Sequence, residues 1–339
     1  MKNLRDLTYD ELESVIVSLG EKKFRANQIF DWLTKGVSSY EEMHNIPKSL
    51  KDKLAEDYYV YGLKIVKKLE SSIDGTKKYL FALYDGNMVE TVVMYYKHGI
   101  TVCISSQVGC AMGCKFCAST IGGLVRSLSA GEILEQVIFA QKDIGERISN
   151  IVMMGIGEPL ANLDNVLRFL YNVNDEKGLN IGYRHISLST CGIVPNIYEL
   201  AKHKLPITLS ISLHATSNES RSSIMPVNNS FCIEELIDAC RHYQHECGRR
   251  ISFEYAIIKN VNDSTQNAEQ LIRLLKGIMC HVNVIPVNNV DENNFEKPDP
   301  HTVKVFCETL EKKGITATVR RELGSDINAS CGQLRKNNM

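Results

Sequence analysis

Three cysteines stand close together in the stretch CAMGCKFC, at Cys110, Cys114 and Cys117. Cysteine thiolates at such short spacing are typical metal ligands. A zinc site normally takes four protein ligands in two pairs, and this sequence holds no second CxxC pair. An iron–sulfur cube has four irons, so three cysteines would leave one iron open to a substrate or cofactor. The spacing favours a [4Fe-4S] cluster over the alternatives, a zinc ribbon and three structural cysteines.

The elements around this loop alternate regularly between strand and helix. Helical stretches such as SAGEILEQVIFAQKDIG (129–145) and HTVKVFCETLEKKG (301–314) separate short β-rich runs. Such alternation predicts an α/β fold built from βαβ units around a parallel sheet. Six or seven units form an open or closed barrel, whose chemistry lies at the carboxyl ends of the strands. The runs are ITVCISS (100–106), NIVMMGIG (150–157), HISLST (185–190), ITLSISLHA (207–215), ISFEYAII (251–258), HVNVIPV (281–287) and TATVRR (316–321).

Two different segments precede the barrel. Residues 1–55 read as a helical accessory unit, which begins with a capping box at Thr8 and Glu11. Residues 56–97 are β-rich and contain a hairpin signal, Asp-Gly-Asn, at positions 85–87. The predicted domains are therefore 1–55, 56–97 and a barrel core at 98–339.

Composition restricts the classes of function. The 39 Lys and Arg against 40 Asp and Glu give a net charge of −1, so a nucleic-acid surface must be a local patch. We find no signal-peptide core and no apolar run long enough for a membrane span, which predicts a cytoplasmic protein with no membrane contact. The eleven cysteines are then expected to be mostly reduced.

Several long motifs occur in a fixed order from one end of the chain to the other. Together they resemble the RlmN family of radical S-adenosylmethionine (SAM) enzymes, which methylate C2 of adenosine in 23S ribosomal RNA and certain tRNAs. The resemblance covers essentially the whole chain. The motifs are FRANQIFDWL (24–33), CISSQVGCAMGCKFCAST (103–120), MMGIGEPLAN (153–162), SLSTCGIVP (187–195), SISLHATSNESRSSIMPVN (210–228) and RRELGSDINASCGQL (320–334).

The resemblance implies a fold and a cofactor set. The fold would be a partial (βα)6-type TIM barrel, the radical SAM core. Cys110, Cys114 and Cys117 would hold the [4Fe-4S] cluster, and SAM would chelate the open iron and be cleaved to a 5′-deoxyadenosyl radical, with two SAM used per turnover. The positions that match SAM-binding residues of the family are Gly157, Glu158, Ser189, Ser212, Leu213, His214 and Asn288.

The family chemistry also implies three catalytic residues. C2 of adenine is electron-poor and has no lone pair with which to attack the methyl of SAM, so a thiolate carries the methyl group first. Cys331 matches the cysteine that accepts this methyl, and Cys103 matches its partner in a transient disulfide. Glu90 is a candidate base for the C2 proton, in concert with or instead of Cys103. Without the resemblance, each of these cysteines reads as a small buried apolar residue. The cysteines left with that interpretation are Cys191, Cys232, Cys240, Cys247, Cys280 and Cys307.

The same resemblance implies RNA substrates and redox partners. These are 23S rRNA at adenosine 2503, tRNA at adenosine 37, a cytosolic electron donor and a thiol reductant, and we expect a monomer. In an RNA enzyme, basic residues near the motif loops would hold phosphates while the target base is splayed out. The candidates are Lys22, Lys23, Arg25, Arg126, Arg221, Arg320, Arg321, Arg335 and Lys336.

Two alternatives remain at this point. One is the related enzyme that methylates C8 of adenosine and confers antibiotic resistance; it shares the cluster cysteines and the equivalents of Cys103 and Cys331. The chain reads GEPLAN (157–162), whereas the C8 enzymes tend to have alanine after the glutamate. The other is a noncatalytic iron–sulfur or zinc RNA-binding protein, for which Cys103 and Cys331 would be dispensable.

Overall fold

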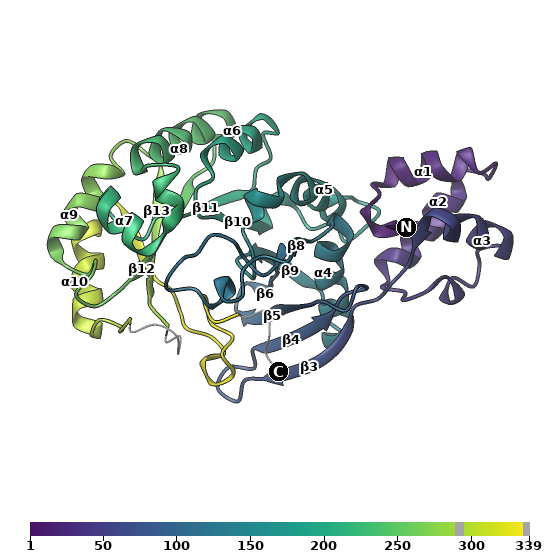
Figure 1. The fold of residues 1–339 in the computed structure, drawn as a ribbon, viewed down its shortest axis with the longest axis horizontal. Coiled ribbons are helices and arrows are strands. Elements are labelled where there is room, and N and C mark those ends of the chain that lie inside the picture. The colour runs from purple at the N-terminus through teal and green to yellow at the C-terminus, as the bar shows by residue number, and fades with distance from the viewer. Residues whose placement is uncertain (289–294, 335–339) are drawn as a thin grey trace.

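One large curved sheet organises the molecule (Figure 1). The computed structural model describes residues 1–288 and 295–334. In these residues ten strands run in the order β14-β13-β12-β11-β10-β9-β6-β5-β4-β3, with β14 and β3 at the two edges. The sheet is therefore open. Its strands are β3 (Lys64–Glu70), β4 (Lys77–Ala82), β5 (Met88–Tyr96), β6 (Gly99–Cys103), β9 (Ile148–Met153), β10 (Ile186–Thr190), β11 (Thr208–Ser212), β12 (Ile251–Ile257), β13 (Cys280–Pro286) and β14 (Thr316–Val319).

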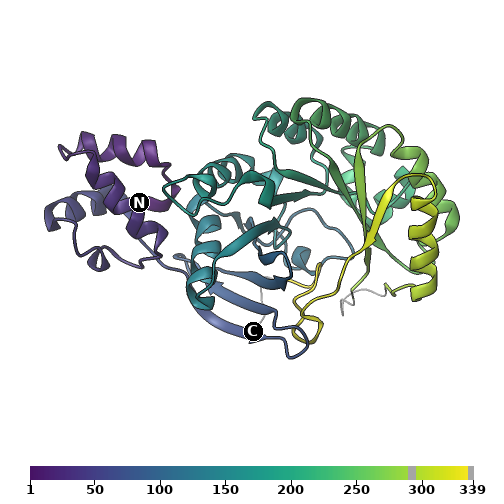
Figure 2. The ribbon, with the colours of Figure 1, turned by 180° about the vertical axis from the view of Figure 1, so that it is seen from behind.

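Within the ten-stranded sheet, β6 and the strands from β9 to β14 pair in parallel, and a helix lies in each connection between neighbours. Figures 1 and 2 show these helices around the outside of the curved sheet. All seven predicted β-rich runs form strands, which confirms the α/β fold with a partial barrel. The helices are α4 (Ala130–Ile144), α5 (Leu163–Asn174), α6 (Val194–Lys202), α7 (Asn218–Ile224), α8 (Ile233–Cys247), α9 (Thr265–Leu274) and α10 (Pro300–Glu311).

Strands β3, β4 and β5 continue this sheet in antiparallel fashion, with β5 paired to β6. The predicted hairpin joins β4 to β5, and Gly86 adopts the left-handed φ of +84° that its turn requires. The β-rich segment is thus part of the sheet that carries the site. A short antiparallel pair, β7 (Gln107–Val108) and β8 (Arg126–Ser127), flanks the cysteine loop.

The N-terminal residues form a helical unit with its own apolar core. It holds α1 (Tyr9–Ser18), α2 (Phe24–Thr34) and α3 (Lys48–Asp57), and β1 (Lys2–Asn3) pairs with β2 (Tyr58–Tyr59). The predicted capping box at Thr8 and Glu11 is present. The unit lies at one side of the sheet, next to α4 and α5 (Figure 1). Among the described helices, none has the length and apolar character needed to cross a membrane.

A buried ion pair joins the helical unit to the barrel. The Arg5 guanidinium lies 3.2 Å from Glu135 of α4, and both side chains are almost fully buried. Arg5 also donates to the carbonyl oxygens of Leu33, Val37 and Tyr61. One side chain therefore satisfies backbone groups of the helical unit and a carboxylate of the core.

We predict that Arg5→Met lowers the free energy of unfolding by about 3 kcal/mol or more, because Glu135 then remains buried without its cation. Urea denaturation measures this change. Lys35→Met is the matched control, since the ion pair between Lys35 and Asp31 is exposed and its loss should cost less than about 1 kcal/mol. Equal effects of the two substitutions would contradict the prediction.

Candidate active site

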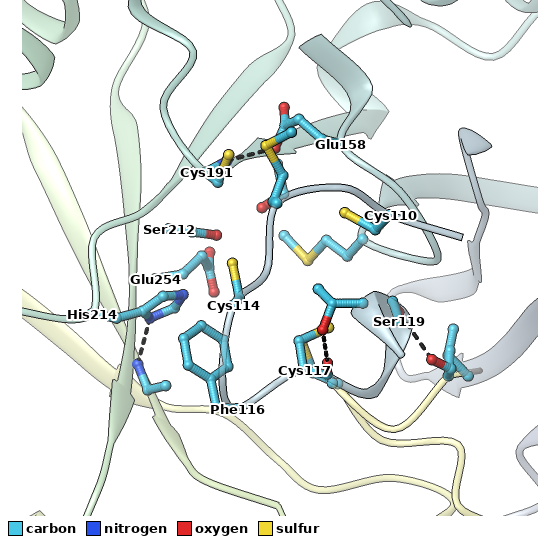
Figure 3. Close-up of a pocket in the computed structure, with 18 of the residues that line it drawn as sticks. Cys110, Cys114, Phe116, Cys117, Ser119, Glu158, Cys191, Ser212, His214 and Glu254 are labelled. Carbon is cyan, nitrogen blue, oxygen red and sulfur yellow. Dashed lines mark hydrogen bonds between the residues drawn. The ribbon is translucent and has the colours of Figure 1, made fainter. Parts of the chain in front are cut away.

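The three cysteines of the CAMGCKFC loop line one cavity beside the carboxyl ends of the parallel strands, about 1010 Å³ including its mouth. Cys110 and Cys114 are buried and Cys117 is partly exposed. The backbone N–H of Lys115 donates to the carbonyl of Ile224 and so fixes the loop to the end of α7. Figure 3 shows the three sulfur atoms around the same space.

The electrostatics of these thiols fit an iron–sulfur cluster. Burial raises the pKa of Cys110 to about 12 and also raises the pKa of Cys114 and Cys117, so a positively charged group is needed to keep them as thiolates. Within the described residues, no three His, Cys, Asp or Glu side chains converge on one point as ligands of a single ion would. The three thiols that line the cavity could serve as the protein ligands of a cluster, which binds its ligands at separate corners.

The glycines of the GIGEP motif, residues 155–159, bring the chain close to its neighbours. A Cβ at Gly155 would lie 2.6 Å from the carbonyl oxygen of Ile104. Gly157 has a φ of +105°, and a Cβ there would lie 2.6 Å from Cβ of Gln107. Only glycine fits at either position without displacement of β6 or of the loop that follows it.

Glu158 holds this turn against the next strand. Its carboxylate accepts the N–H of Cys191 at 2.7 Å and the N–H of Leu160 at 2.9 Å. Burial raises its pKa, although these hydrogen bonds oppose the shift. The side chain lines the cavity, but its two oxygens bind backbone N–H groups, one just after β10 and one in its own turn. Glu158 therefore shapes the pocket.

Most of the positions that match SAM-binding residues lie at this cavity. Its lining includes Gly157, Glu158, Ser189, Ser212, His214 and Asn288. Leu213 differs, because its side chain packs in the main core and its N–H donates to the carbonyl of Glu254. Leu213 thus points away from the cavity, although Ser212 and His214 on either side of it line the cavity.

His214 is held as a neutral imidazole. Its Nδ1 atom accepts the N–H of Ala256 at 2.8 Å, which leaves the proton on Nε2. Burial, with a smaller contribution from Arg221, lowers its pKa to about 3. The ring meets Phe116 edge to face at 4.7 Å between centroids, and Figure 3 shows both rings beside Cys114. His214 can therefore donate a hydrogen bond without carrying charge.

Cys331 lies between two cavities. It lines the cavity of the cluster loop and also a second one, about 700 Å³ with its mouth, which Cys103 lines from the end of β6. Cys331 is exposed, whereas Cys103 is buried. Burial and the neighbouring Cys331 raise the pKa of Cys103 to about 12, and Arg320 partly opposes this. The two cysteines thus share a pocket although 228 positions separate them.

Three hydrogen bonds hold the segment that carries Cys331. The Asn288 amide donates to the Cys331 carbonyl at 2.8 Å. From the cluster loop, the N–H of Ala118 donates to the carbonyl of Gly332, and the Ser119 hydroxyl donates to the carbonyl of Leu334. The terminal segment is therefore attached to the cluster loop itself.

Glu90 lies outside both of these cavities. Its buried carboxylate on β5 forms an ion pair with Nζ of Lys78 at 2.9 Å. It lines a third cavity, next to the terminal segment, together with Lys67, Ile327 and Asn328. A role as base would require adenine to reach this third cavity.

The cavity also contains residues that were not predicted as site residues. Cys191 follows β10 at the cavity wall, and Glu254 of β12 accepts from Asn283 at 2.7 Å and lies 3.7 Å from Arg320. Strand-end position could have indicated Cys191, and a lone carboxylate in the apolar run ISFEYAII could have indicated Glu254. Cys240 and Cys307, by contrast, are buried in their helices as expected.

The structure corrects part of the RNA-contact prediction. Arg221 is completely buried and donates to the carbonyls of Cys191 and Ser212, so it cannot meet phosphate. Arg126 is held by Asp85 and Glu132. Arg335 and Lys336 lie outside the described residues. Lys22, Lys23 and Arg321 are exposed, and Arg25 and Arg320 are partly exposed.

An open barrel with three cysteines on the loop after its first parallel strand is the arrangement of radical SAM enzymes. Residues 104–275 match the radical SAM superfamily, and residues 2–60 match the family described as ribosomal RNA large subunit methyltransferase N-terminal domain. A radical SAM methyltransferase from Sphaerobacter thermophilus has the same fold, with a TM-score of 0.94 and 44% identity over 99% of this chain and 100% of that one.

Relatives match over nearly the full length of the chain. The probable dual-specificity RNA methyltransferase RlmN of Clostridium novyi (strain NT) is 57% identical over 99% of this chain and 98% of its own. The protein of the same name from Alkaliphilus oremlandii (strain OhILAs) is 58% identical with the same coverage. The chain belongs to the RlmN family, and its superfamily implies a [4Fe-4S] cluster and SAM.

We predict that Gly157→Ala weakens SAM binding about tenfold or more, because the new methyl group meets Gln107 and the residue must keep a positive φ. Equilibrium dialysis with the reconstituted protein measures the affinity. Gly182→Ala is the control, since its φ is −61° and the nearest atom to a new Cβ is 3.7 Å away. Unchanged SAM affinity in the Gly157 variant would show that the turn does not shape the pocket.

A second prediction concerns pH. The folded chain keeps His214 neutral down to about pH 3, whereas the unfolded chain protonates it near 6.5. Stability should therefore fall as pH falls through this window, with a contribution of about 1.4 kcal/mol per pH unit. His214→Asn should flatten the pH dependence of the unfolding free energy, and His301→Asn, at an exposed residue of α10, should not. An unchanged slope in the first variant would contradict the assignment.

Proposed function

We propose that this protein methylates C2 of adenosine in RNA, in the cytoplasm, with Cys331 as the methyl carrier. The substrates are adenosine 2503 of 23S rRNA and adenosine 37 of tRNA. The observation that carries the proposal is that Cys331 lines both the cavity of the cluster loop and the cavity of Cys103. The names of the close relatives, probable dual-specificity RNA methyltransferases, support RNA as the substrate.

The proposal assigns the residues that would hold each cofactor. Cys110, Cys114 and Cys117 would hold a [4Fe-4S] cluster that, with bound SAM, supplies a 5′-deoxyadenosyl radical. The glycine turn and the strand-end side chains around the same cavity would position SAM. A second SAM is used in each turnover as the methyl donor to Cys331. An electron donor and a thiol reductant complete the cycle.

Cys331 is suited to the first step because it is exposed. Its thiolate attacks the methyl carbon of SAM, an S–CH₃ bond forms, and S-adenosylhomocysteine leaves. The methyl carbon, once it has lost one hydrogen atom to the radical, would bond to C2 of adenine. The resulting adduct would then lose its C2 proton to a base and its unpaired electron to the oxidised cluster. The buried thiol of Cys103 then releases the product. Its sulfur bonds to the Cys331 sulfur, the C–S bond breaks, and the carbon keeps the electron pair and takes up a proton to become the methyl group.

Glu90 is the proposed acceptor of the C2 proton, alone or with Cys103. Its support is a buried carboxylate beside the segment that carries Cys331. The carboxylate lines a different cavity from the cysteine pair, so the proposal requires the segment to move or adenine to reach that cavity.

The helical unit, proposed as residues 1–55, would contact RNA in a monomeric enzyme. Its match to the ribosomal RNA methyltransferase N-terminal family supports this role, as does the exposure of Lys22 and Lys23. Residues 56–97 are proposed as the β-rich extension and residues 98–339 as the catalytic core.

We predict that the reconstituted protein, incubated anaerobically with SAM, a reductant and 23S RNA, yields 2-methyladenosine, and that Cys331→Ala abolishes the product. Mass spectrometry of the digested RNA measures it. Cys232→Ala is the control, because Cys232 caps α8 away from both cavities and should leave the yield unchanged.

Two other outcomes would contradict the proposal. 8-Methyladenosine would identify the enzyme as the C8 type with the same methyl carrier. No methylated adenosine from a protein with a demonstrated cluster would favour the noncatalytic interpretation.

A further inference from the structure

The segment Leu323–Leu334, here termed the carrier segment, is fastened to the β3–β4 hairpin as well as to the cluster loop. Asp326 accepts the N–H and the hydroxyl of Ser72, at 3.0 and 3.2 Å. Asp74 in the same turn accepts the N–H of Gly324 at 3.0 Å. These contacts lie at the edge of the molecule and are exposed or partly exposed, so each contributes little by itself.

One contact between the carrier segment and the sheet is of a different kind. Lys78 of β4 is nearly fully buried, and its Nζ donates to the carbonyl oxygen of Asn328 at 3.0 Å. The same Nζ forms the ion pair with Glu90 at 2.9 Å. An ammonium group removed from water needs such partners, and each bond to it is stronger than a bond between neutral groups. Lys78 thus joins the carboxylate of β5 to the middle of the carrier segment.

The carrier segment covers Cys103. Leu323, Ala329 and Leu334 form an apolar cluster with Cys103 and Val92. This cover consists of residues on both sides of Asn328, so its position over Cys103 depends on where the Asn328 backbone is held as well as on the bonds from Ala118, Ser119 and Asn288. Loss of that attachment would open the second cavity toward solvent.

We infer that Lys78 is a positioning residue that holds the carrier segment over Cys103 by bridging Glu90 and the Asn328 carbonyl. Its effect is to keep the resolving thiol covered and close to Cys331 until RNA enters. The catalytic meaning of this arrangement rests on the proposed function, whereas the structural bridge does not.

The test measures the rate at which N-ethylmaleimide alkylates Cys103 in the full-length, cluster-loaded protein, by mass spectrometry that resolves each cysteine. Lys78→Met should raise this rate roughly tenfold, as expected for the loss of a hydrogen bond to a charged group. Lys78→Arg should restore most of the protection, since a guanidinium can still bridge the two oxygens. Lys67→Met is the matched control, because Lys67 lines the same cavity and is exposed, and it should leave the rate unchanged.

A double variant separates the bridge from simple disruption of a buried charge. Lys78→Met alone leaves Glu90 without its cation, which destabilises the surroundings. In Lys78→Met with Glu90→Gln both charges of the ion pair are removed, yet the bond to Asn328 is still lost, so Cys103 should stay reactive. If the double variant protects Cys103 like the wild type, the inference is wrong, and thermal melting of each variant verifies that it is folded.

A second readout follows the two thiols. Oxidation with diamide should form the Cys103–Cys331 disulfide faster in the wild type than in Lys78→Met, because the attachment keeps the sulfur atoms near each other. An equal rate would overturn the positioning role. Neither readout requires RNA methylation, so a failure of the proposed function and a failure of this inference can be told apart.

Discussion

The arrangement of the site depends on the hydrogen bonds that fasten the carrier segment across the open side of the barrel. Three of them involve Ala118, Ser119 and Asn288, which lie far from Cys331 along the chain. A backbone or amide hydrogen bond contributes only about 1 kcal/mol. Because the three act on a short segment together with buried leucines, they fix one location for Cys331, at the wall between the two cavities.

That location puts the two cysteines in different environments. Cys331 is exposed and lines the cavity of the cluster loop, whereas Cys103 is buried and its pKa is raised to about 12. A buried thiol with a raised pKa reacts slowly with solvent oxidants and electrophiles. The same apolar cover that protects Cys103 also places it beside Cys331. The burial of Cys103 and its position next to Cys331 thus have the same structural cause.

The helical unit is tied closely to this site. Asp6 accepts the N–H of Gly131 at the first turn of α4, the helix that follows the cluster loop, and Arg5 pairs with Glu135 one turn later. A negative side chain at a helix N-terminus is stabilising. The helical unit therefore keeps a fixed orientation relative to the cluster loop, since both lie at the same end of α4.

The sequence by itself determined the elements whose signals are local. The capping box at Thr8, the hairpin at Gly86, the seven strands of the barrel and the cysteine triplet all follow from spacing within a few residues, and backbone geometry converts such spacing directly into structure. The tertiary structure decided which side chains meet. Arg221 proved to be buried, Leu213 turned into the core and Cys191 joined the cavity. Lys78 contacts Asn328 across 250 positions. Such contacts depend on how distant segments pack, and no local pattern specifies burial or partners over that separation.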